Sequence, residues 1–100
     1  MNEKVLLTDT MEQTANIFGN FDMNTAMIEK AFGVSVANRK TDNTLGDAII
    51  IRGDDADAVN AAYSVLEYLK GVDARGNEIT EQTVDYIIGT VKGGEKLERF

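Results

Sequence analysis

Apolar residues along the chain fall into short runs whose spacing predicts strands that alternate with helices. Residues 4–8, KVLLT, form a short apolar run that predicts a strand. Thr10 and Gln13 have the spacing of a capping box, which predicts a helix that runs through about Phe18. Gly19 is the expected end of this helix, because glycine takes the left-handed conformation at little cost.

A second helix is expected directly after Gly19–Asp22, GNFD. Asp22 is its predicted N-cap, since a carboxylate at that position can accept the free N–H groups of the first turn. The expected apolar face of this helix consists of Met27, Ile28, Ala31 and Phe32. Gly33 is expected to end it. Two helices joined by a loop of four residues therefore precede the next strand.

A hairpin is predicted in the middle of the chain. Val34 and Val36 alternate with smaller residues, as in a half-buried strand, whereas residues 48–51, AIII, form a continuous run that is typical of a buried strand. Residues 41–46, TDNTLG, are turn formers and are expected to close the hairpin.

A long helix is predicted after the hairpin. Gly53 and Asp54 are expected to end the preceding strand and to cap this helix, and Gly71 is expected to end it. Its apolar positions repeat at intervals of three and four, and they are Val59, Ala62, Tyr63, Leu66 and Leu69.

The last helix has the strongest start signal in the chain. Thr80 is the predicted cap, and Ile79 can form a hydrophobic staple with Val84. The expected buried stripe is Val84, Ile87, Ile88 and Val91. The whole pattern predicts an α+β fold in the order β-α-α-β-β-α-α, with a three-stranded sheet and helices packed mainly on one face. We expect one domain over residues 1–92 and the start of a linker over 93–100, GGEKLERF.

Composition narrows the classes of function. The 100 residues include no cysteine and no histidine, which removes disulfides, the usual zinc ligands and the usual neutral-pH general base. We therefore expect no catalytic residues, no metal and no cofactor in this chain. No apolar run approaches the roughly 20 residues that span a bilayer, so we expect no membrane contact and a cytoplasmic location.

The charge balance argues against general attraction to nucleic acid. Ten Lys and Arg oppose seventeen Asp and Glu, which gives a formal net charge of −7. The negative charge of the chain repels phosphates, so any RNA binding must rely on a local group of cations.

Two residue patterns partly resemble a calcium-binding loop and a nucleotide-binding loop. Asp54, Asp55 and Asp57 lack the spacing and the distant Glu of a calcium loop, and capping residues are the expected role. GTVKGGEK, residues 89–96, places Glu95 before the lysine and has no following Ser or Thr, so we expect no nucleotide site.

The order of elements resembles the KH RNA-binding fold, in which a GXXG loop clamps the nucleic-acid backbone. The local match is residues 17–28, IFGNFDMNTAMI, in which Gly19 stands at the first glycine and Asp22 at the second. The chain also resembles the N-terminal KH-like domain of PhoH-family ATPases over about nine-tenths of its length. The segments that carry this likeness are FGNFDMNTAMIEKAFGVSVANRK, DAIIIRGDDADAVNAAYSVLEYL and ITEQTVDYIIGTVK. The resemblance implies a downstream P-loop ATPase domain that binds ATP and acts on RNA.

The resemblance makes the loop Gly19, Asn20, Phe21 and Asp22 the candidate RNA contact, with free helix amides holding a phosphate. The alternative is a simple turn in which Asp22 caps the helix and repels phosphate. Phe21 stacks on a base in the first interpretation and packs on Ala26 as a hydrophobic staple in the second, which we favour.

Three cations complete the candidate RNA surface, and they are Lys30, Arg39 and Lys40. A KH-like arrangement would place them beside the groove, although isolated surface charges are usually only solvated. Two functions stay open. The first is an accessory domain that binds single-stranded RNA weakly beside the ATPase domain, and the second is a protein-interaction domain that has lost RNA binding.

Overall fold

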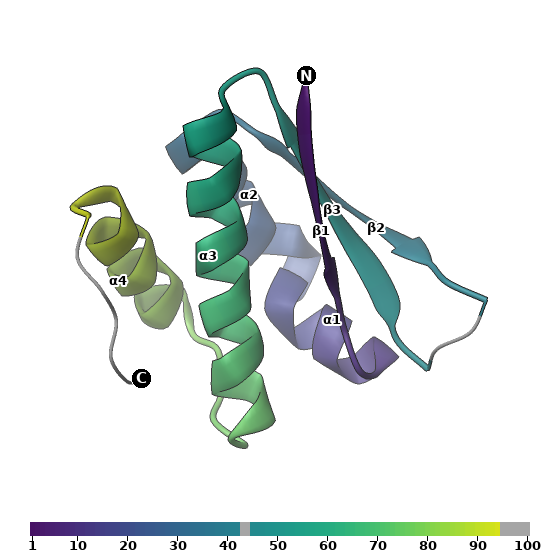
Figure 1. The fold of residues 1–100 in the computed structure, drawn as a ribbon. Coiled ribbons are helices and arrows are strands. Elements are labelled where there is room, and N and C mark those ends of the chain that lie inside the picture. The colour runs from purple at the N-terminus through teal and green to yellow at the C-terminus, as the bar shows by residue number, and fades with distance from the viewer. Residues whose placement is uncertain (43–44, 95–100) are drawn as a thin grey trace.

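The computed structural model describes residues 1–42 and 45–94. Its elements are β1 (Asn2–Leu7), α1 (Met11–Phe18), the short 3-10 helix η1 (Asn20–Asp22), α2 (Met23–Phe32), β2 (Ser35–Lys40), β3 (Asp47–Gly53), α3 (Ala56–Ala74) and α4 (Glu81–Lys92) (Figure 1). The predicted α+β class and the order β-α-α-β-β-α-α are confirmed.

The three strands form one antiparallel sheet with β3 in the centre, in the order β1-β3-β2. The register places Leu6 opposite Ile49 and Val36 opposite Ile51, and paired residues share a face of the sheet. The predicted hairpin is confirmed by the pairing of β2 with β3, and part of its turn, residues 43–44, lies outside the described residues. β3 is apolar throughout its middle because neighbours flank both of its edges.

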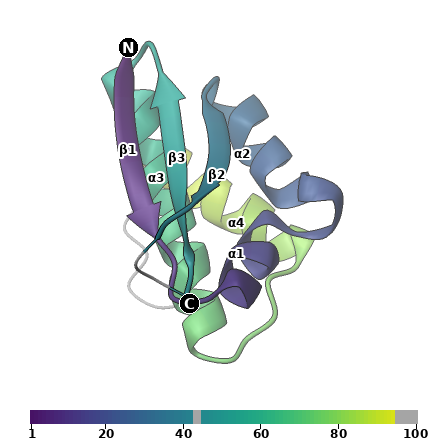
Figure 2. The ribbon, with the colours of Figure 1, turned by 90° about the vertical axis from the view of Figure 1, so that its right-hand side faces the viewer.

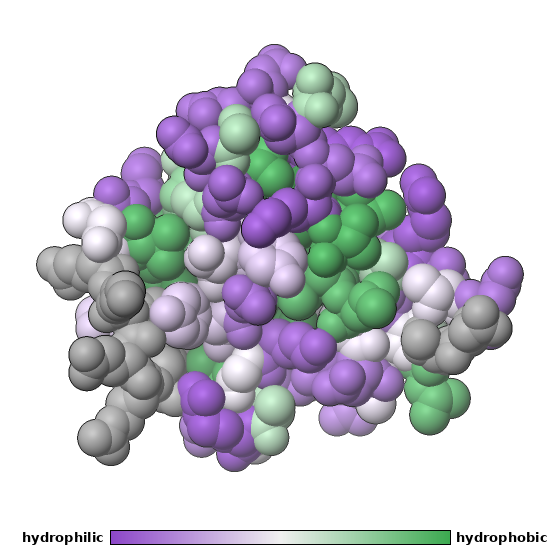
Figure 3. Space-filling model, in the orientation of Figure 1, coloured by the Kyte–Doolittle hydropathy of each residue, from purple (hydrophilic) through white to green (hydrophobic). Residues whose placement is uncertain are grey.

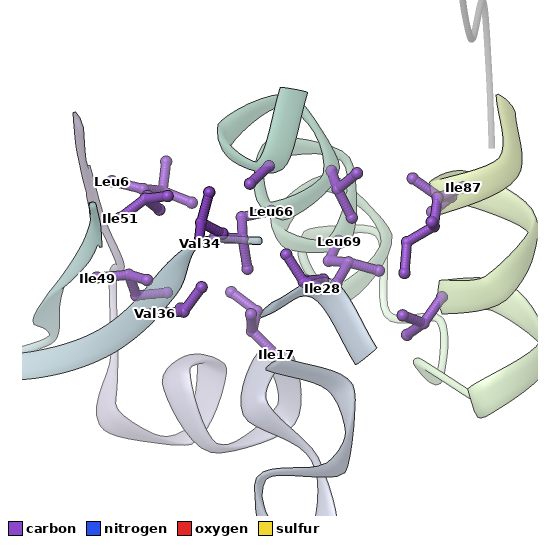
Figure 4. Close-up of a cluster of buried hydrophobic side chains, with 14 of the residues drawn as sticks. Leu6, Ile17, Ile28, Val34, Val36, Ile49, Ile51, Leu66, Leu69 and Ile87 are labelled. Carbon is purple, nitrogen blue, oxygen red and sulfur yellow. The ribbon is translucent and has the colours of Figure 1, made fainter. Parts of the chain in front are cut away.

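The helices lie on one side of the sheet, as the sequence predicts (Figures 1 and 2). Helices α1, α2 and α3 contact the strands, whereas α4 contacts α2 and α3. The core fills the space between the sheet and these helices, and each α-helix contributes to it (Figure 4). Fully buried helical side chains include Ile17, Ile28, Leu66, Leu69 and Ile87. Burying each of them contributes roughly 1.5–3 kcal/mol.

The other face of the sheet is not covered by any described helix. Val5 and Leu7 point to this face from β1 and are about half exposed. Figure 3 shows a hydrophobic patch over β1 and β3 at this position. Ala48 and Ile50 of β3 lie on the same face and are buried, so this face is exposed along β1 rather than at its centre.

Several predicted helix ends are confirmed by their hydrogen bonds. The Thr10 hydroxyl accepts the Gln13 backbone N–H at 3.0 Å, and the Thr80 hydroxyl accepts the Thr83 N–H at 3.1 Å. Gly33 ends α2 in the left-handed conformation, with φ at 67°.

The predicted start of α3 is one residue too early, and its predicted end is wrong. The N-cap is Asp55 rather than Asp54, because the Asp55 carboxylate accepts the Asp57 N–H at 2.9 Å, which confirms the expected capping role of Asp55. The helix also continues through Gly71 to Ala74. Val72 lies in the core just beyond that glycine, and its burial outweighs the roughly 1 kcal/mol that a glycine inside a helix costs.

No helix among the described residues is long and apolar enough to cross a membrane. The predicted linker over 93–100 lies mostly outside the described part of the chain, which stops at residue 94.

Candidate functional site

The loop Gly19–Asp22 joins α1 to α2 through the short helix η1. Phe21 and Asp22 have φ angles of 55° and 57°, and they are the only non-glycine residues with positive φ in the described part of the chain. The left-handed region is rare for residues with a side chain and costs roughly 1–2 kcal/mol per residue. The loop therefore holds two consecutive residues in a conformation that is unfavourable for stability.

Gly19 is required at the start of this loop for two reasons. Its φ of 79° favours glycine, and a Cβ atom there would lie 2.6 Å from the side-chain nitrogen of Asn24. Asn24 is itself buried in the first turn of α2. Packing of α2 against Gly19 thus fixes how the chain enters the loop.

The predicted staple between Phe21 and Ala26 is wrong. The Phe21 side chain is 97% exposed, which is the largest exposed fraction among the exposed large hydrophobic residues. A staple requires the ring to pack on the first turns of the helix. The left-handed backbone at Phe21 and Asp22 instead points the ring away from the helix. The aromatic ring is therefore presented to solvent.

The predicted capping role of Asp22 is also wrong. Asp22 precedes α2, but its backbone is left-handed rather than extended and its side chain makes no capping hydrogen bond. Its carbonyl oxygen instead accepts the hydroxyl of Thr25 at 3.1 Å. The carboxylate of Asp22 therefore does not occupy the first amides of α2, as the simple-turn interpretation required.

The three candidate cations do not share one face. Lys30 lines a cavity between α2 and α4 together with Asp85. Arg39 and Lys40 end β2, opposite Ala48 and Asp47, and consecutive strand residues point to opposite faces of the sheet. All three are exposed, and their part in RNA binding stays a prediction.

Carboxylates from the second half of the chain lie beside the loop, which the sequence did not indicate. A cavity of about 240 Å³ is lined by Gly19 and Asn20 on one side and by Asp73 and Glu78 on the other. Asp73 accepts a hydrogen bond from the Asn16 side chain at 2.8 Å. These contacts join residues more than fifty positions apart, so only the fold brings them together. One flank of the loop is therefore acidic.

Known proteins give no further guidance about this site. No protein-family model matches the chain, and searches of curated proteins and of solved structures found no match. Within residues 1–42 and 45–94, no group of three or more acidic side chains has the arrangement of a metal site. What the loop binds is therefore inferred from its own residues.

Proposed function

We propose that this chain is a KH-like accessory domain that binds single-stranded RNA weakly, with the ring of Phe21 as a stacking platform. The observation that carries the proposal is the full exposure of Phe21 on a left-handed backbone. Strained backbone persists where the surrounding structure holds it, and such residues cluster at binding sites. A base stacked on an aromatic ring contributes roughly 1–3 kcal/mol.

Phosphate contacts in this proposal come from the start of α2 and the end of β2. The first amides of α2 are not capped by Asp22, and a helix N-terminus attracts anions. Arg39 and Lys40 add two exposed cations. The acidic flank of the loop and the net charge of −7 keep the affinity low, at roughly 10⁻⁴ to 10⁻⁶ M, and sensitive to salt.

The resemblance to PhoH-family ATPases supports a role beside a motor domain. We assign ATP chemistry to a downstream domain and give this chain no catalytic role. A cytoplasmic location follows from the same proposal. The accessory domain would position RNA, and the motor would supply most of the affinity.

Fluorescence anisotropy with a labelled single-stranded RNA, about eight nucleotides long to match the small site of one domain, tests the proposal. Replacing Phe21 by alanine should weaken binding about tenfold, because one stacking contact is lost. Met11→Ala removes another exposed apolar side chain, on α1, and should leave the affinity unchanged. Equal RNA affinities for the wild type and Phe21→Ala would reject the loop as the RNA contact.

A further inference from the structure

Four cavities that share lining residues lead from the loop to the junction of α2 and α4, and we call them together the groove. Their volumes are about 240 to 360 Å³. The cavities are numbered here from the loop toward the α2–α4 junction. Gly19 and Glu78 line the first and second cavities, and Glu81 lines the second and third. Met27 and Asp85 line the third and fourth. Figure 2 shows α2 and α4 side by side along this line.

Methionine side chains, which we call the floor of the groove, line the second to fourth cavities, whereas the first is lined mostly by polar residues. Met27 and Ile88 line the groove between α2 and α4, and Met23, which is about half exposed, lines it nearer the loop. Methionine side chains are unbranched and polarizable, and they adapt to differently shaped apolar partners. A groove floored by methionine therefore suits the apolar side of a polypeptide segment.

The rim of the groove is strongly acidic. Its carboxylates come from the end of α3, the α3–α4 connection and the first half of α4, and they are Asp73, Glu78, Glu81 and Asp85. Glu81 and Asp85 are four residues apart on α4 and so lie on one side of that helix. Lys30 is the one cation that lines these cavities among the described residues. Charge complementarity thus selects a positively charged occupant.

We propose that this groove docks a basic amphipathic segment of a partner protein, with lysine or arginine against the carboxylates and apolar side chains on the methionines. A helix laid in an apolar groove is a common mode of peptide recognition, and basic residues on its polar face match an acidic rim. The proposal does not involve the stacking contact of Phe21, which lines none of the four cavities, although Gly19 and Asn20 of the same loop line two of them.

A labelled amphipathic peptide of lysine and leucine, about 12 residues long to match α4, is the probe for fluorescence anisotropy. The groove variant combines Glu78→Gln, Glu81→Gln and Asp85→Asn. The control variant combines Glu12→Gln, Asp54→Asn and Glu67→Gln, which removes three exposed carboxylates elsewhere. Each variant changes the net charge equally, and each removes one carboxylate from the first turn of a helix, Glu81 or Glu12.

The groove variant should bind the peptide at least about tenfold more weakly than the wild type, which corresponds to about 1.4 kcal/mol. The control variant should bind within about twofold of the wild type, because distant exposed charges are screened by salt. Equal weakening of both variants would show general attraction of a basic peptide to an acidic protein and overturn the proposal. Failure of the wild type to bind at millimolar peptide would overturn it as well.

A second probe tests the methionine floor. A peptide with serine in place of leucine keeps the charge and should bind about tenfold more weakly, whereas equal binding would overturn the apolar contact. RNA and peptide are titrated into separate samples of the ¹⁵N-labelled chain, because a basic peptide and RNA would bind each other. Amide shifts around Glu81 and Asp85 on adding RNA would assign the groove to nucleic acid instead of protein, whereas shifts there with the peptide alone support the proposal.

Discussion

Two helix starts with similar sequence signals are built in different ways. At α4, Thr80 has an extended backbone, accepts the Thr83 N–H and follows Ile79, which packs against the core. At α2, Asp22 has a left-handed backbone, makes no capping bond and follows Phe21, which is exposed. The first start has a side-chain cap, whereas the second has none and leaves the Phe21 ring exposed.

The difference shows which of the two starts contributes to stability. A side-chain cap is worth about 1 kcal/mol, and a staple adds apolar burial. The α2 start has neither and also holds two residues in an unfavourable conformation. The start of α2 therefore contributes less to stability than the start of α4, and the RNA contact that we propose would account for its sequence.

The largest difference in the free energy of unfolding should come from removing one side chain on α4 and one in the loop before α2. Ile87→Ala on α4 should lower the free energy of unfolding by about 3 kcal/mol, because Ile87 is fully buried and a cavity remains. Phe21→Ala should change it by less than about 0.5 kcal/mol, as is usual for exposed positions. Urea unfolding of both variants measures the difference. A loss of 2 kcal/mol or more for Phe21→Ala would mean that the ring packs in solution.

Two glycines test the strain at the ends of the helices that flank the loop. Gly19→Ala should cost about 2 kcal/mol or more, because φ 79° with ψ 176° is a region that is essentially open only to glycine and the new Cβ would meet Asn24. Gly33→Ala, at a left-handed position with nothing within 4 Å, should cost only about 1 kcal/mol. Thermal unfolding of both variants measures the difference, to which the backbone region and the Asn24 contact both contribute. Equal losses would contradict the strain assigned to the start of the loop.

The two caps should respond differently to alanine. Thr80→Ala should cost about 1 kcal/mol, because it leaves the Thr83 N–H without its acceptor. Asp22→Ala should cost less than about 0.5 kcal/mol, because no capping bond is lost. Chemical denaturation is again the measurement, and a cost near 1 kcal/mol for Asp22→Ala would restore its capping role.

Asp22→Gly is the one variant among these that should raise stability. Glycine accepts the left-handed backbone, so stability should rise by about 0.5 kcal/mol despite the extra freedom of the unfolded chain. The same change removes a negative charge beside the first amides of α2 and should tighten RNA binding. Unchanged RNA affinity with a folded protein would separate the start of α2 from phosphate binding.

The helices and strands of this fold are well predicted from the sequence, because each has an apolar face that must be turned toward the core. Alternating Val34 and Val36 and the run AIII place β2 and β3, and Thr10 and Thr80 mark their helices. The end of α3 was missed because burial of Val72 outweighs the local signal of Gly71.

The candidate site is less predictable from the chain. The left-handed backbone at Phe21 and Asp22 overrides the staple and the cap that local pattern favours. The acidic groove joins α2 to α4, so its carboxylates have no local pattern that relates them to the loop. Both features depend on tertiary packing.

An NMR titration of the ¹⁵N-labelled chain with single-stranded RNA tests the central claim most directly. The account predicts shifts of the Gly19, Asn20, Phe21 and Asp22 amides, with smaller shifts at the end of β2. The amides at the end of α4, around Thr90 and Val91, should not shift, because these residues line none of the cavities beside the loop. Shifts centred on α4, or no shift at millimolar RNA, would contradict the claim that the start of α2 is a binding element.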